Sequence, residues 1–127
     1  MDKTNKKILI IDDNPSTVET LKMILETEGY ETAGAYNGEV GVKKAISLHP
    51  DLIMLDLMLP DIDGYKVCEK IKNNPEIKDI PVVILTGKDK GDDFDRAMEK
   101  DADWYIVKPY KVEHLLKVFR RLIEKDE

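Results

Sequence analysis

The sequence predicts an α/β fold, a doubly wound, five-stranded parallel sheet with helices on both faces. Three observations support this fold class. Short apolar runs rich in β-branched residues alternate with stretches of helical periodicity, the pattern of successive strand–helix units. Several of these runs are apolar without alternation, as expected of central strands covered on both faces. The chain has 127 residues, enough for one core and too few for two ordinary domains, so residues 1–127 are predicted to form a single domain.

The five strand-like runs differ in strength. The first, third and fourth are continuous apolar segments, whereas the second and fifth give weaker signals. In chain order, the predicted strands are 7–11, 30–35, 52–57, 82–86 and 104–107.

Helical periodicity fills the segments that follow the strands. Pro15 begins the first helix with Asn14 as its expected cap, and Gly29 stands just past the end of that helix. In the last helix, apolar residues recur at steps of three and four, which predicts a broad face packed on the sheet. The predicted helices are 15–28, 38–48, 64–72, 92–100 and 112–124.

Composition and charge restrict the possible functions. The chain carries 20 basic and 26 acidic residues, a net charge of −6, and has no basic stripe, so direct binding to nucleic acid is not expected. No apolar run is long enough for a signal peptide or a membrane span. Cys68 is the only cysteine, which excludes an internal disulfide and fits a reducing compartment. A cytoplasmic location is therefore expected.

Polar residues occur where the predicted strands end. Asp12 and Asp13 follow the first strand, Asp56 lies near the end of the third, and Thr86 and Lys108 close the fourth and fifth. Parallel α/β sheets place ligand sites at the carboxyl ends of their strands, so these side chains are expected to converge. Each has an ordinary structural explanation when taken alone, because paired aspartates often cap a helix and Lys-Pro often marks a turn. Their joint occurrence at four strand ends favours a functional site.

This set of residues predicts phosphoryl chemistry assisted by a metal ion. Three neighbouring carboxylates repel one another, and a hard cation such as Mg2+, which accepts carboxylate and phosphate oxygens, would offset that repulsion. Lys108 and Thr86 would supply a positive charge and a hydroxyl donor for phosphoryl oxygens. A carboxylate can attack a phosphoryl donor to form an aspartyl phosphate, and Asp56 is the expected nucleophile.

Four stretches of the chain read "ILIIDDNP", "DLIMLDLMLPDIDGYKVCEKIK", "IPVVILTGK" and "ADWYIVKPY". Together they resemble the receiver domains of bacterial response regulators, the phosphorylated components of two-component systems. The resemblance covers nearly the whole chain, from Lys7 to Ile123. It implies a flavodoxin-like fold with strand order 2-1-3-4-5.

The resemblance also implies a metal site. Asp12 and Asp13 match the acidic pair that holds Mg2+, or Mn2+ in its place, with Asp13 the more direct ligand. Asp56 matches the phosphoacceptor and contributes to the same metal site. Met58 falls where the family offers a backbone carbonyl to the metal, so its side chain need not disturb the coordination.

Further residues match the parts of the family that respond to phosphorylation. Thr86 matches the switch hydroxyl, and Lys108 matches the lysine that binds the phosphoryl group. Tyr105 matches an aromatic side chain that turns inward when the switch hydroxyl moves. Pro109 matches a Lys-Pro step at which a cis peptide bond is expected.

The implied function is a phosphorylation-dependent signalling switch. Such a chain accepts a phosphoryl group from a histidine kinase or phosphotransfer protein and signals to a downstream effector or output domain. It catalyses only its own phosphorylation and dephosphorylation, so turnover of an external substrate is not expected. A phosphorylation-dependent dimer is left open.

Two alternatives stay within the same fold. The chain could be a receiver excised from a larger output-bearing regulator such as a transcription factor. It could also be a pseudo-receiver that binds partners without being phosphorylated, although all five site positions are intact.

Two other classes fit the sequence less well. The string "DIDG" resembles the catalytic loop of haloacid-dehalogenase phosphatases, but Pro60 precedes it, so Asp61, Asp63 and Gly64 are interpreted as turn and cap residues. A flavodoxin-like FMN protein would need a hydroxyl- and glycine-rich phosphate loop after the first strand, where this chain has the acidic "DDNPS".

Overall fold

The structure, a computed structural model, describes residues 6–57, 59–87 and 102–123. Strands alternate with helices through the first part of the chain, as the sequence predicts. The elements are β1 (Lys7–Ile11), α1 (Pro15–Thr27), β2 (Glu31–Ala35), α2 (Gly38–Leu48), β3 (Leu52–Asp56), α3 (Gly64–Lys72), β4 (Val82–Thr86), β5 (Trp104–Val107) and α5 (Val112–Ile123).

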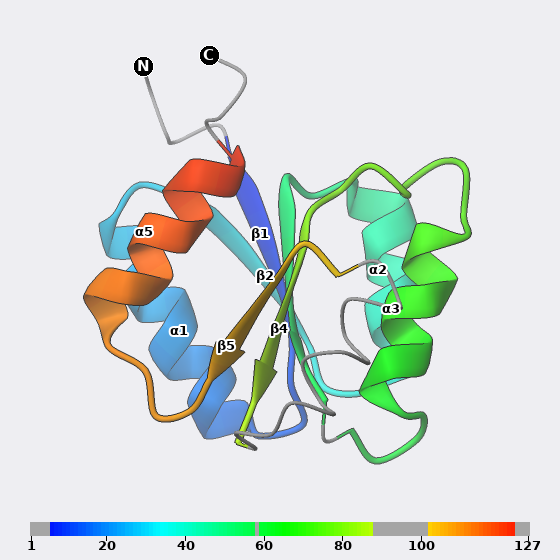
Figure 1. Ribbon diagram of the computed structural model, residues 1–127, viewed down its shortest axis with the longest axis horizontal. Coiled ribbons are helices and arrows are strands. Elements are labelled where there is room, and N and C mark those ends of the chain that lie inside the picture. The colour runs from blue at the N-terminus through cyan, green and yellow to red at the C-terminus, as the bar shows by residue number, and fades with distance from the viewer. Residues whose placement is uncertain (1–5, 58, 88–101, 124–127) are drawn as a thin grey trace.

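The strands form one parallel sheet in the order β2-β1-β3-β4-β5, which confirms the predicted topology (Figure 1). β1 lies between β2 and β3, with Ile11 in register with Ala35 on one side and with Leu55 on the other. β3 and β4 are in register at Asp56 and Leu85. Because all strands run in the same direction, their carboxyl ends meet at one edge of the sheet.

Helices cover both faces of the sheet and enclose two apolar layers. α1 and α5 lie on one face, and α2 and α3 lie on the other (Figure 1). Successive residues of a strand point to opposite faces, so Ile8 and Ile10 pack beneath α1 and α5, whereas Leu9 and Ile11 pack beneath α2 and α3. These four strand residues are almost completely buried. We call the two clusters the α1/α5 layer and the α2/α3 layer.

Three predicted element boundaries are wrong by one residue. α1 ends at Thr27 because Glu28 is its cap, with ψ near 0°, and Gly29 then takes a left-handed conformation with φ 98°. β2 begins at Glu31, and β3 ends at Asp56. The predicted helix 92–100 and residue 124 lie outside the described residues. Along the described stretches, no helix combines the length and the apolar character needed to cross a membrane.

Candidate functional site

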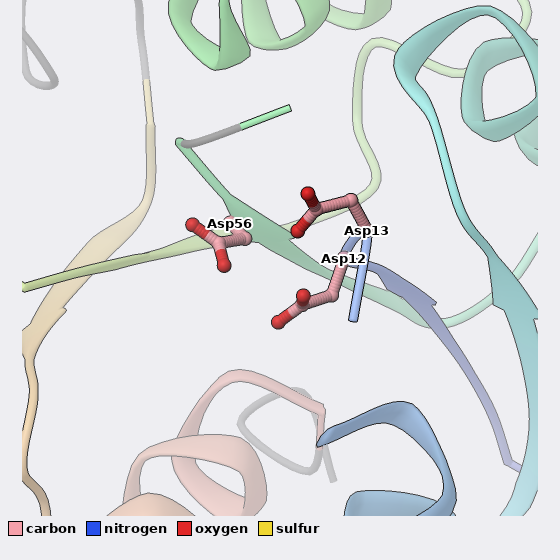
Figure 2. A group of neighbouring side chains, drawn as sticks. All are labelled: Asp12, Asp13 and Asp56. Carbon is pink, nitrogen blue, oxygen red and sulfur yellow. The ribbon is translucent and has the colours of Figure 1, made fainter. Parts of the chain in front are cut away.

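Three carboxylates meet at the carboxyl edge of the sheet, as the sequence predicts. Asp12 and Asp13 directly follow β1, and Asp56 is the last residue of β3. One oxygen atom from each of the three lies within 4.8 Å of the others. Figure 2 shows the three side chains around a common space, with two from the residues that follow β1 and one from the end of β3. Asp12 and Asp56 are buried, with 2% and 5% of their surface exposed, whereas Asp13 is exposed.

The register of the central strands brings these residues together. Ile11 pairs with Leu55, so the next residues along the two strands are Asp12 and Asp56. The Asp12 N–H continues the sheet pattern by donating to the Ala35 carbonyl at 3.0 Å. Beyond it the chain turns into α1, and the backbone N–H of Asn14 donates to Asp12 Oδ1 at 2.9 Å.

Asn14 is the cap of α1, which confirms the sequence interpretation. Its side-chain oxygen accepts hydrogen bonds from the N–H groups of Ser16 and Thr17, at 2.9 and 3.4 Å. Pro15 occupies the first turn, where a missing N–H group costs nothing. The cap fixes where α1 starts, and the short turn therefore holds both aspartates at the strand end.

Lys108 reaches the carboxylate cluster from the end of β5. Its Nζ lies 3.1 Å from Asp56 Oδ2, close enough for a charge-assisted hydrogen bond. The backbone N–H of Lys108 donates to the Thr86 carbonyl at 2.7 Å, which holds the end of β5 against β4. The peptide bond between Lys108 and Pro109 is cis, as predicted.

The electrostatics of the cluster favour a bound cation. Burial raises the pKa of Asp12 from 3.8 to about 6; the Asn14 N–H opposes this rise and the negative charge of Asp56 adds to it. Asp12 Oδ2 is buried and has no hydrogen-bond partner among the residues that the structure describes. An acidic oxygen in this position is a suitable ligand for a hard divalent ion. The residues present therefore fit a metal site.

Thr86 and Tyr105 lie on strands next to the cluster. Thr86 is buried at the end of β4 and follows Leu85, the register partner of Asp56. Tyr105 is half-buried in β5, opposite Ile84, and packs against the α2/α3 layer. Since Ile84 and Thr86 are two residues apart on one strand, their side chains point to this same face. Met58, the remaining predicted site residue, lies outside the described residues.

The sequence did not predict the contacts of two further residues on the connections near the site. Tyr110 lies on the connection from β5 to α5 and packs against the α1/α5 layer. Burial raises the pKa of its hydroxyl, and the negative charge of Asp12 raises it further. Asp61 reaches from the segment after β3 to the start of α2. Both placements depend on how connections fold back over distant elements, which local patterns do not encode.

Comparison with known proteins places the chain in a family. A model of the response regulator receiver domain matches residues 8–120. Among curated proteins, the DNA-binding dual master transcriptional regulator RpaA of Synechocystis is 40% identical over 121 residues, which cover 95% of this chain and 50% of that protein. The alkaline phosphatase synthesis transcriptional regulatory protein PhoP of Bacillus subtilis is 42% identical over 106 residues, covering 84% of this chain and 43% of that protein.

Solved structures agree with the fold and the family. A two-component response regulator from Clostridium difficile superposes with a TM-score of 0.90 at 32% identity, covering 97% of this chain and 99% of that chain. The signal receiver domain of a signal transduction histidine kinase from Syntrophus aciditrophicus gives 0.88 at 38% identity, covering 94% and 91%. The chain spans about half the length of the curated relatives it matches. The sheet order, the acidic cluster and these matches together establish that the chain belongs to the response regulator receiver domain family, the signalling switches of two-component systems.

Proposed function

We propose that Asp56 is the phosphoacceptor of this receiver domain and takes its phosphoryl group from a phosphohistidine of a histidine kinase or phosphotransfer protein. The observation that carries this proposal is the convergence of three carboxylates, with Lys108 on an oxygen of Asp56. In the transfer, a carboxylate oxygen of Asp56 attacks phosphorus, the phosphorus–nitrogen bond breaks, and the histidine regains its nitrogen lone pair. Asp56 becomes an acyl phosphate.

Asp12, Asp13, Asp56 and the backbone carbonyl of Met58 would hold Mg2+, or Mn2+ in its place. When bound, this ion neutralises the phosphoryl oxygens and the carboxylates around them. The orphaned Asp12 Oδ2 and the raised pKa of Asp12 support this assignment.

Thr86 and Lys108 would bind oxygens of the phosphoryl group once it is attached. Thr86 ends β4, which pairs with β3, and Lys108 follows β5, the next strand on the same side, so both approach Asp56 from one direction. Thr86 would draw the chain after β4 toward Asp56, and Tyr105 would pack into the space behind it. Such contacts shift the balance between two states of the same fold.

The chain then acts as a switch rather than as an enzyme that turns over an external substrate. Curated relatives of about twice its length are named DNA-binding regulators, so we propose that it signals to an output domain or a separate effector. Residues 1–127 would serve as one receiver unit in the cytoplasm without binding nucleic acid or membrane themselves. Phosphorylation-dependent dimerisation of such units is compatible with this proposal.

The test is the mass of the intact chain after incubation with acetyl phosphate, with Mg2+ and with a chelator. We expect a gain of one phosphoryl group that requires Mg2+ and is lost on treatment with hydroxylamine, which cleaves acyl phosphates. No gain under any condition would favour the pseudo-receiver that binds partners without phosphorylation.

Replacing Lys108 by Met should change metal binding and phosphorylation in opposite directions. The ammonium group lies 3.1 Å from Asp56 Oδ2 and competes with any cation there, so Lys108→Met should bind Mg2+ more tightly. The variant should be phosphorylated about ten-fold more slowly, because the charge that meets the arriving phosphoryl oxygens is missing. Calorimetric Mg2+ titration and the rate of mass gain measure the two effects.

The matched control for this variant is Lys111→Met. Lys111 is exposed and lies three residues beyond Lys108, so this change removes the same charge close to the site. It should leave both quantities as they are in the unsubstituted chain. Equal phosphorylation rates for Lys108→Met and the control would contradict the role given to Lys108.

A further inference from the structure

The segment that follows Asp56 is attached to the start of α2 through the side chain of Asp61. Asp61 Oδ1 accepts a hydrogen bond from the backbone N–H of Gly38 at 2.8 Å, and Oδ2 accepts one from Glu39 at 2.9 Å. These partners lie 23 and 22 residues earlier in the sequence. Both N–H groups belong to the first turn of α2, where no acceptor exists within the helix and a negative charge is favoured. Asp61 therefore caps a helix to which it does not belong.

Local capping does not account for these contacts. α2 has a cap of its own, because the Asn37 side-chain oxygen accepts from the Val40 N–H at 2.9 Å. The helix that follows Asp61 is capped by Asp63, whose carboxylate accepts from the Tyr65 N–H at 2.9 Å. The hydrogen bonds of Asp61 thus join two separate parts of the chain.

Close packing accompanies the two hydrogen bonds. A Cβ atom added at Gly38 would lie 2.5 Å from Ile62 Cγ1 and 2.8 Å from Val67 Cγ2, so only glycine lets α2 approach this closely. Ile62 is the residue after Asp61. The N–H groups of Gly38 and Glu39 also hold the pKa of the Asp61 carboxyl below its usual value, so the group is charged at neutral pH.

The joined segment begins at the proposed phosphoacceptor. The Leu57 N–H donates to the Leu85 carbonyl, and the Leu57 carbonyl accepts from the Gly64 N–H, each at 3.3 Å. The chain is therefore held at Leu57 by the sheet and by the start of α3, and again at Asp61 by α2. Position 58, whose carbonyl is proposed as a metal ligand, lies in the sequence between these two anchors.

We infer that Asp61 is a positioning residue for metal binding and phosphorylation at Asp56, acting by fixing the segment 59–63 against the start of α2. It touches neither the metal nor the phosphoryl group, and its effect passes through the backbone beside the acidic cluster. This inference rests on the proposed function, since it takes the cluster to be the place where the metal and the phosphoryl group bind.

The test compares Asp61→Ala and Asp61→Asn with the unsubstituted chain and with Asp79→Ala. Asp79 is an exposed acid between α3 and β4. It lies near the amino ends of the strands, on the side of the sheet opposite to the site, so its replacement removes one charge far from the site. Mg2+ affinity is measured by calorimetry, and the maximal rate of mass gain is measured at saturating Mg2+ and acetyl phosphate. Urea unfolding of each variant reports its folded fraction.

For Asp61→Ala we expect both the Mg2+ affinity and the maximal rate to fall about ten-fold, the scale found for groups that orient metal ligands. Asp61→Asn should recover only part of this loss, because its one amide oxygen can accept from Gly38 or Glu39 but its NH2 group cannot accept from the other. Asp79→Ala should match the unsubstituted chain.

Three results would overturn the inference. The first is an Asp61→Ala variant that is folded and keeps the Mg2+ affinity and maximal rate of the unsubstituted chain. The second is a fall in affinity and rate that the unfolded fraction of Asp61→Ala fully explains. The third is an equal fall in Asp79→Ala. If the unsubstituted chain binds Mg2+ but gains no phosphoryl group, the proposed function fails. The comparison of Mg2+ affinities then still decides whether Asp61 positions the site.

Discussion

Substituting Asn for Asp56 should abolish phosphoryl uptake while leaving the chain folded. The amide has nearly the shape of the carboxylate, but it lacks the negative oxygen that would attack phosphorus. Folding should survive because Asp56 closes β3 at the edge of the sheet, above strand residues that are fully buried and unaltered. The measurement is the intact mass after incubation with Mg2+ and acetyl phosphate, alongside urea unfolding of the same samples.

Asp79→Asn is the matched control for this experiment. This substitution makes the same chemical change at an exposed position near the amino ends of the strands, far from the site. The variant should gain one phosphoryl group at the rate of the unsubstituted chain. A gain of mass in Asp56→Asn equal to that of the control would place the phosphoacceptor elsewhere. Loss of the folded state would be seen as a change in the unfolding curve.

Substituting Asn for Asp12 should stabilise the metal-free chain and weaken its metal binding. In the folded chain the pKa of Asp12 is about 6, compared with 3.8 for an unperturbed carboxyl. The folded state therefore binds the proton more tightly than the unfolded state, so this group makes the chain less stable as the pH rises from about 4 to above 6. The shift corresponds to at most about 3 kcal/mol, and we expect Asp12→Asn to regain about 1–3 kcal/mol at pH 7.5 in the presence of a chelator.

The pH dependence of stability shows whether the gain comes from removing the buried Asp12 charge or from a general change in packing. At pH 4 most of the Asp12 carboxyl is protonated in the folded chain, so the advantage of the Asn variant should nearly vanish. Addition of Mg2+ should reverse the order of stability, because the variant loses one ligand and should bind the ion about 10- to 100-fold more weakly. A stability gain of the same size at pH 4 and pH 7.5 would show that burial of the charge is not its cause.

The parts of the fold that could be predicted are those that repeat along the chain. Runs such as Val82–Thr86 are too apolar to lie anywhere except between two covered faces, and they predicted the parallel sheet, whereas the strand order came from the resemblance to receiver domains. The site could be predicted because parallel strands end on one side of the sheet, so Asp12, Asp56 and Lys108 were expected on that side, where the strand order brings them together.

The parts that could not be predicted depend on contacts between distant segments. The composition around Asp61 indicated a turn, but nothing in that stretch specifies that its carboxylate meets the N–H groups of Gly38 and Glu39. The place of Tyr110 near Asp12 likewise depends on the packing of α5 on the sheet. The end of α1 shifted by one residue because its cap, Glu28, is set by backbone angles that the residue type does not determine, and β2 starts one residue later because the Tyr30 N–H donates to the Leu25 carbonyl of α1.

The sheet divides the apolar interior into two layers that pack independently of each other. Ile10 and Ile11 are neighbours on β1, yet one packs beneath α1 and α5 and the other beneath α2 and α3, and the layers share no side chain among the described residues. Substitutions on opposite faces lack common packing partners, so their costs in folding free energy should add. The packing of the α2/α3 layer, against which Tyr105 lies, should therefore tolerate substitutions in the α1/α5 layer.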